Sequence, residues 1–199
     1  MSISNRLNKH FVAATAAVAV AGVANAAVVY SGIVNLTIPA NVDGLYMNVE
    51  TGATGTSGTG TAGWDINPYG TTNLALYAAT GTGYMRAAGT TSTSRTNIGN
   101  NAVVGASAFF YGSSSATVGT GVGQWAFNST GTIGFKFLAA DGLTHYGWAR
   151  IAIGASLASR TLVDYAFEST AGASITTLPA PGAIALLGLA GLVARRRRA

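Results

Sequence analysis

The chain has 199 residues, no cysteine, 9% charged residues and a formal net charge of +5. The missing cysteine excludes disulfide bonds and thiolate metal sites. Six of the eleven basic residues lie near the two ends, so residues 27–181 hold five basic and six acidic residues, a net charge of −1. This near-neutral middle excludes the basic footprint of a nucleic-acid-binding domain, and no nucleic-acid partner is expected.

The N-terminus has the order of a secretory signal peptide. Arg6 and Lys9 form a basic region, an almost purely apolar run covers residues 11–23, and Ala24-Asn25-Ala26 is an A-x-A cleavage signal. We expect the export machinery to recognise residues 1–26 and cleavage to occur between Ala26 and Ala27.

Residues 27–177 read as one all-β domain, an antiparallel β-sandwich or jelly roll. Apolar residues alternate with polar ones in many short segments, and turn-forming residues separate these segments. The predicted strands are Val28–Ile38, Leu45–Glu50, Asn73–Ala78, Ala102–Tyr111, Val122–Phe127, Thr132–Leu138, Tyr146–Ile153 and Thr161–Glu168. On the last strand, Val163, Tyr165 and Phe167 are expected to share one face. Turns are predicted at 41–44, 67–70 and 140–142.

One segment, Thr51–Gly63, consists almost entirely of Gly, Thr, Ala and Ser. Because it lacks the apolar residues that offset the entropy of ordering, a flexible surface loop is predicted. Its Thr-x-Thr pairs also resemble the threonine arrays of ice-binding proteins, but the pairs do not recur at a fixed period.

The search for catalytic chemistry favours a non-enzymatic protein with no catalytic residues. Residues 27–181 contain one histidine, His145, and no G-x-S-x-G, H-E-x-x-H or Walker motif. Asp164 and Glu168 are four residues apart on one predicted strand, which separates them by roughly 13 Å at about 3.3 Å per residue. Glycosidase carboxylates sit about 5–9.5 Å apart, so this pair alone makes no such site.

No metal or cofactor is expected. Asp65-Ile66-Asn67 and Asp141-Gly142 supply oxygen ligands of the kind that calcium prefers, but neither has the full spacing of a calcium loop. Calcium therefore stays a minor alternative.

Four aromatic residues, Trp64, Trp125, Tyr146 and Trp148, are candidate glycan contacts, because sugar rings stack on aromatic faces. The alternative is that these rings fill the core. Three functions stay open: a non-enzymatic surface or matrix protein, a carbohydrate-binding module, and a glycan-active enzyme with carboxylates that meet across strands.

The C-terminal segment 178–199 reads as a sorting tail. The apolar run from Ala183 to Ala194 has 12 residues and precedes Arg195, Arg196, Arg197 and Arg198. As a helix this run spans roughly 18 Å, against about 30 Å for a bilayer core, so a short transmembrane segment is predicted. The four arginines hold the C-terminus in the cytoplasm.

The tail resembles that of the PEP-CTERM class of exported bacterial proteins, whose tail is also labelled as an ice-binding protein C-terminus. Pro179 and Pro181 match the family motif, Ala180 stands where that family has Glu, and the Gly- and Leu-rich run 186–192 and the arginines follow. The resemblance implies a transient inner-membrane anchor, an exosortase-like processing enzyme and delivery to the cell surface or beyond. It also implies extracellular polysaccharide as a partner. The sortase and lipid-anchor tails are the alternatives.

A second resemblance lies just before the tail. The segments Gly134–Phe137, His145–Ile151 and Val163–Glu168 resemble a block that recurs in many exported proteins of this class. This block implies three consecutive antiparallel strands and a domain type, but no activity.

Overall fold

The computed structural model describes residues 27–86, 96–119 and 123–177, and these residues form an all-β domain. Every pair of named strands is antiparallel, and the described residues contain no helix. The predicted fold class is confirmed at this level. The predicted signal peptide, the sorting motif Pro179-Ala180-Pro181 and the arginines at 195–198 lie outside the described residues.

The largest sheet, called the main sheet below, is built around one long hairpin. Its strand order is β1 (Val28–Tyr30), β13 (Arg160–Glu168), β12 (Thr144–Ile153), β11 (Ser129–Leu138), β7 (Gly83–Arg86) and β9 (Phe109–Tyr111), and β2 (Leu36–Thr37) also pairs with β13. Strands β11 and β12 pair over their whole length, from Ser129↔Ile153 to Leu138↔Thr144. The turn between them contains the predicted Asp141-Gly142, with Gly142 at φ +77°.

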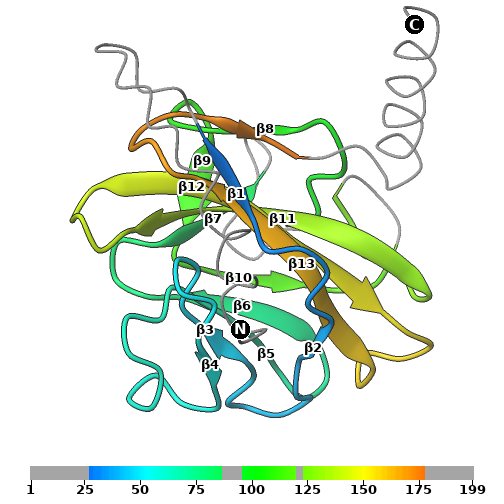
Figure 1. Cartoon of the computed structure of the whole chain (residues 1–199). Helices are drawn as coiled ribbons and strands as arrows, with labels where there is room; N and C mark the ends of the chain where they lie inside the picture. The colour runs from blue at the N-terminus through cyan, green and yellow to red at the C-terminus, as the bar shows by residue number, and fades with distance from the viewer. Residues whose placement is uncertain (1–26, 87–95, 120–122, 178–199) are drawn as a thin grey trace, which may run out of the picture.

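A second sheet faces the main sheet. Its order is β10 (Ser113–Ala116), β6 (Leu74–Ala78), β5 (Ile66–Tyr69), β3 (Tyr46–Met47) and β4 (Thr54–Gly55). A two-stranded ribbon of β8 (Val103–Val104) and β14 (Ile175–Thr176) crosses the opposite face of the main sheet. The molecule thus has three layers, with the main sheet between the ribbon and the second sheet (Figure 1).

The main sheet is apolar on both faces because both are covered. Between the two sheets lies the larger core, which includes Met47, Leu76, Phe135 and Phe137, each fully buried. A smaller core under the ribbon joins Tyr146, Trp148 and Ala166 to Val104 and Ile175. This double burial explains why residues 131–135 of β11 and 145–149 of β12 are all buried, without the alternation of a sheet that exposes one face.

A β-bulge in β13 changes which residues share a face. Arg150 pairs with Asp164 and the next residue, Ile151, pairs with Leu162, so Val163 is the extra residue. The bulge brings Leu162 into the same core as Tyr165 and Phe167, while Val163 lies outside that core. The prediction that Val163 shares their face is therefore wrong, because strict alternation does not survive an inserted residue.

Three further predictions of local structure are corrected. The segment Val122–Phe127 is no strand over its described residues: Trp125 forms only an isolated bridge with Val118. Residues 67–69 belong to strand β5 and do not form a turn. Pro68 has no N–H, but β5 pairs with β3 only at Met47↔Ile66, so this proline interrupts little hydrogen bonding between the two strands. The segment Thr51–Gly63 forms β4 and a series of turns instead of an unstructured loop, and it buries Thr61.

Candidate functional site

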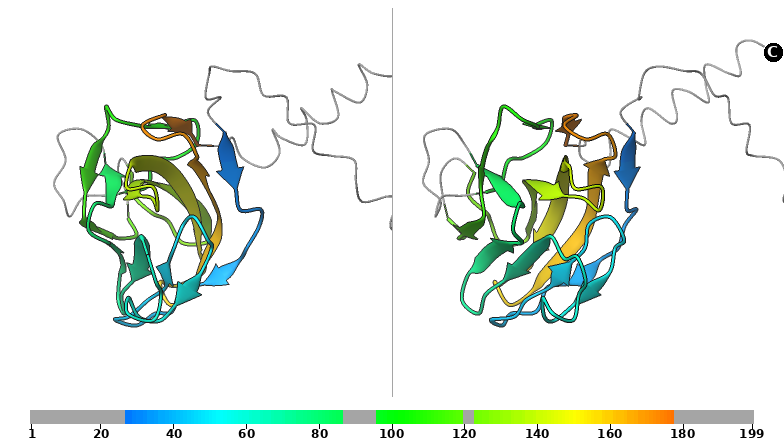
Figure 2. Two further views of the ribbon diagram at one scale, coloured as in Figure 1. Left: turned by 60° about the vertical axis from the view of Figure 1, so that its left-hand side comes forward. Right: turned by 90° about the vertical axis from the view of Figure 1, so that its left-hand side faces the viewer.

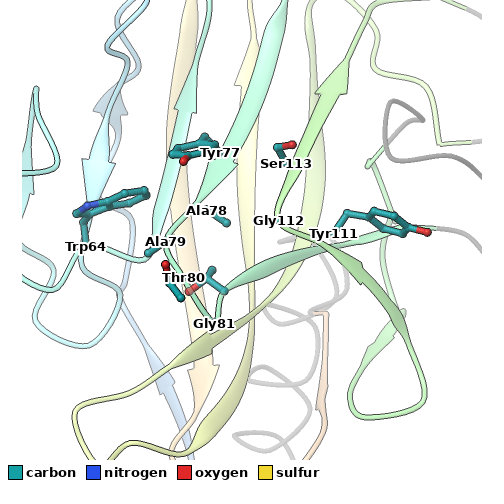
Figure 3. A pocket seen from close by; sticks show the side chains of 10 residues that line it. Trp64, Tyr77, Ala78, Ala79, Thr80, Gly81, Tyr111, Gly112 and Ser113 are labelled. Atoms are coloured by element: carbon teal, nitrogen blue, oxygen red, sulfur yellow. The ribbon is translucent and has the colours of Figure 1, made fainter.

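An open depression of about 640 Å³ lies where the chain crosses between the two sheets. The chain leaves the second sheet after β6 through residues 79–82, and it returns from β9 to β10 through Gly112. The rings of Trp64, Tyr77 and Tyr111 flank the depression, and the small residues 78–82 and 112–113 complete its lining (Figure 3). We call this feature the aromatic depression.

Two of its rings stand on the outer face of the second sheet. Tyr77 lies between Leu76 and Ala78, which point into the core, so its ring points outward and is 49% exposed. The indole of Trp64, just before β5, stacks on Tyr77 with ring centroids 5.8 Å apart and planes 28° apart. Tyr46 meets the same indole edge-on at 4.8 Å. These contacts hold Trp64 in one orientation beside the depression.

The low-complexity segment Thr51–Gly63 packs against these rings. At Gly58 an added Cβ would lie 2.7 Å from Trp64 Nε1 and 3.2 Å from the Tyr46 ring, so only glycine allows this close approach. Asn48 Nδ2 donates to the carbonyl of Gly63 at 2.8 Å and joins the end of the segment to the sheet. The glycine content of this segment predicted flexibility, but in the structure Gly58 instead allows the backbone to pack closely against the rings of Trp64 and Tyr46.

The third ring, Tyr111, lies on the other side of the depression (Figure 3). Its face covers the guanidinium of Arg86, whose Cζ is 3.2 Å from the ring centroid. Arg86 is 8% exposed, and among the residues that the structure describes its Nε and Nη1 have no hydrogen-bond partner. The cation–π contact therefore provides the main compensation that the structure shows for this buried charge, and it holds the Tyr111 ring in place.

The chemistry of the lining is uncharged. None of the described residues that line the depression is Asp, Glu, Lys, Arg or His, and exposed Thr80 and Ser113 contribute hydroxyl groups. Aromatic rings beside hydroxyl groups and backbone polar groups offer apolar stacking together with hydrogen bonds. This combination suits a sugar, which has C–H faces and a rim of hydroxyls.

Only one of the four predicted glycan contacts belongs to this site. Trp64 flanks the depression, whereas Trp125 and Trp148 are each 1% exposed and Tyr146 is 7% exposed. Trp148 packs against Tyr30, and Tyr146 against Phe110, so neighbouring side chains cover both rings. A covered ring offers no face for a sugar, and these three residues are core residues instead.

Sequence reasoning missed Tyr77 and Tyr111. Tyr77 had a usable signal, because it is the outward residue between the apolar Leu76 and Ala78. Tyr111 had none, since its place depends on how two distant strand crossings meet.

The carboxylates of β13 are engaged in structural contacts. Asp164 is fully buried, and Arg150 binds it with two nitrogens, Nε at 2.6 Å from Oδ1 and Nη2 on Oδ2. The hydroxyl of Tyr30 also donates to Asp164 Oδ2, at 2.7 Å. Glu168 is 1% exposed and accepts the amide of Thr170. Neither carboxylate lines the aromatic depression.

His145 ties the start of β12 to its surroundings. Its Nδ1 is 2.8 Å from the carbonyl of Glu168, and its Nε2 is 3.1 Å from Asp141 Oδ2. Burial lowers the pKa of His145, but these two bonds and the Asp141 charge outweigh it, so the net pKa is above its ordinary value. The amide of Leu143 and the bond from His145 lower the pKa of Asp141.

The candidate calcium residues also make contacts within the protein. Asp65 Oδ2 accepts the amide of Val49 at 2.8 Å, and Asn67 Nδ2 donates to the carbonyl of Asp43. Within residues 27–86, 96–119 and 123–177, no group of three or more His, Asp or Glu side chains is placed to hold a metal ion.

Comparison with known proteins adds no identification: no protein-family model, curated protein or solved structure matches this chain. Over the part of the chain that the structure describes, no helix is long and apolar enough to cross a membrane.

Proposed function

We propose that this protein is an exported, non-enzymatic glycan-binding protein, which the tail anchors transiently before it reaches the cell surface or the extracellular matrix. The observation that carries the binding function is the aromatic depression. There, Trp64 and Tyr77 present stacked rings beside exposed hydroxyls, and Tyr111 stands opposite. Aromatic rings with a few polar groups in an open hollow are the ordinary elements of a small-molecule or sugar site.

Binding is preferred to catalysis because the depression lacks acid–base groups. A glycosidase needs two carboxylates on either side of the scissile bond. The lining contains none, and Asp164 and Glu168 are buried and bonded elsewhere. The glycan-active enzyme therefore ranks below the binding protein.

Export and anchoring rest on the two ends of the sequence. Residues 1–26 have the order of a signal peptide, and 178–199 resemble a PEP-CTERM tail with a basic stop at Arg195–Arg198. An exosortase-like enzyme is the proposed processing partner, and an extracellular polysaccharide is the proposed ligand.

A glycan array with the exported protein tests the binding function. The key variants are Trp64→Ala and Tyr77→Ala, and Phe127→Ala is the control, because Phe127 is 44% exposed but does not line the depression. We expect each key variant to weaken binding by about tenfold or more, which corresponds to about 1.4 kcal/mol, and the control to bind like the wild type. An array without bound glycans, or equal binding by all variants, contradicts the proposal.

A further inference from the structure

Both ends of the described chain leave the molecule from the same side. Strand β1 begins at Val28, beside Glu168 at the end of β13, and β14 ends at Thr176 on the ribbon. In Figures 1 and 2 the start of β1, at the edge of the main sheet, and the ribbon both lie at the top of the view, and the second sheet lies at the bottom. The layer that carries Trp64 and Tyr77 is therefore the one farthest from the ribbon.

The domain is ordered up to the residue before the tail. Thr177 is 1% exposed, and its amide donates to the carbonyl of Ala102 at 2.9 Å. Its hydroxyl accepts the amide of Ala102 at 2.8 Å and donates to the carbonyl of Gly99 at 3.2 Å. Thr177 is thus fixed to the segment that leads into β8.

Only a short link separates this fixed point from the apolar run of the tail. Residues 178–182 lie between Thr177 and Ala183. Even fully extended, such a link spans only about 20 Å. When the run lies in a bilayer, the ribbon is held within that distance of the membrane surface.

The surface of the ribbon suits such a contact. Residues 96–116 and 169–177, which contain both strands, include no Asp, Glu, Lys or Arg. Val103 is 55% exposed and stands opposite exposed Thr176, and Val28 at the start of β1 is also 55% exposed. An uncharged surface with exposed valines loses little on contact with lipid headgroups.

The exposed carboxylates lie elsewhere. Asp43 belongs to the loop before β3, Glu50 to the turn after it, and Asp141 to the hairpin between β11 and β12. Glu50 Oε2 accepts the amide of Ala140 at 2.7 Å, which joins this hairpin to the second sheet. A carboxylate loses hydration when it is pressed against lipid, so this charge distribution favours the same orientation.

We infer that the ribbon face of β8 and β14 lies against the bilayer while the tail anchors the protein, and that the aromatic depression then faces away from the membrane. This inference rests on the membrane anchor of the proposed function. It assigns a lipid-contacting surface to the folded domain, beyond the contact that the tail itself makes.

The absence of cysteine makes the orientation directly measurable. Val103→Cys on the ribbon and Val42→Cys on the loop before β3 are matched variants, because both valines are exposed, at 55% and 73%. Each variant, with its tail, carries one fluorescent label and is reconstituted in phosphatidylcholine vesicles that contain spin-labelled lipid as a quencher. We expect the quencher to reduce the fluorescence of the label at position 103 and to leave the fluorescence of the label at position 42 unchanged.

Two other outcomes overturn the inference in different ways. Protein that floats with the vesicles but shows equal quenching, or stronger quenching at position 42, refutes the orientation and leaves the anchor intact. Protein that does not float with the vesicles at all refutes the anchor and the orientation together. Neither result bears on glycan binding, which the array tests separately.

Discussion

The indole of Trp64 stacks on the ring of Tyr77, with centroids 5.8 Å apart, although 12 residues separate the two in the sequence. Trp64 precedes β5 and Tyr77 belongs to β6, and these strands pair from Ile66↔Ala78 to Tyr69↔Ala75. The hairpin therefore positions one ring against the other before any ligand binds. A preformed pair of rings lowers the entropy cost of binding.

The close approach of Gly58 to Trp64 predicts a loss of glycan binding in Gly58→Val. The new Cβ would lie 2.7 Å from Trp64 Nε1, so either the indole or the segment 51–63 must move. We expect binding to weaken by about tenfold, or about 1.4 kcal/mol. Titration with the glycan identified on the array measures this change, and Thr56→Val, in the same segment and exposed, is the control. Wild-type affinity in Gly58→Val would show that the segment does not position Trp64.

The buried guanidinium of Arg160 predicts a large stability effect. Its Nη1 donates to the carbonyls of Asn73 and Tyr69, and its Nη2 donates to those of Pro39 and Gly70, at 2.7–3.2 Å. Arg160→Met removes these donors and leaves the carbonyls unpaired, so we expect a loss of about 3 kcal/mol or more in the free energy of unfolding.

Urea denaturation measures the effect of Arg160→Met. Lys136→Met is the control, because Lys136 is only half-buried and its amine lies 5.6 Å from the centre of the Phe110 ring, which predicts a loss of about 1 kcal/mol or less. If both variants unfold at the same urea concentration, the hydrogen bonds of Arg160 to the four carbonyls do not stabilise the fold.

The contact between Tyr30 and Asp164 predicts that the Tyr30 hydroxyl stabilises the pairing of β1 with β13. Tyr30→Phe removes the 2.7 Å bond to Asp164 Oδ2 and keeps the ring that packs on Trp148. We expect the free energy of unfolding to fall by about 1–3 kcal/mol, because the acceptor is a buried charge. Hydrogen exchange of the β1 amides measures where the loss occurs. An unchanged exchange rate at Val28–Tyr30 would contradict this role.

The buried carboxyl of Asp65 predicts a stability that falls as the pH rises. Burial raises the pKa of Asp65 from 3.8 to about 6, the Val49 amide lowers it in part, and the Glu50 charge raises it further. Because the folded state then binds a proton that the unfolded state has lost, stability decreases between pH 3.8 and about 6. A shift of this size corresponds to about 3 kcal/mol at most.

Asp65→Asn isolates this effect, because asparagine keeps an oxygen that can accept the Val49 amide. We expect the variant and the wild type to be about equally stable near pH 4 and the variant to be more stable at pH 7, by about 1–3 kcal/mol. Urea unfolding at both pH values gives the comparison. A stability difference that stays constant with pH would show that Asp65 does not titrate in this range.

The sequence predicts the long strands well because their signal is local. The predicted strands Thr132–Leu138, Tyr146–Ile153 and Thr161–Glu168 all lie within β11, β12 and β13. Long runs of β-branched and aromatic residues between turn residues suffice for this, whatever they pack against. Short strands such as β7 and β10 were missed, since two to four residues carry too little pattern.

The aromatic site depended on the tertiary structure. Alternation alone does not tell which face of a strand meets a second layer, so the sequence makes Trp148 and Tyr146 as plausible as Trp64 for glycan contact. In the structure both residues are buried in the core beneath the ribbon. The segment 51–63 shows the same limit, because its glycines fit either a mobile loop or a close packing on Trp64.

By itself, the sequence determined the antiparallel all-β class, the course of the three longest strands and the near-neutral charge of residues 27–181. These properties follow from composition and from the period of two along each strand. Only the tertiary structure decided that Trp64, Tyr77 and Tyr111 meet at one depression and that Trp125 and Trp148 are buried. The physical reason is that exposure belongs to the packing of layers, and packing depends on residues far apart in the chain.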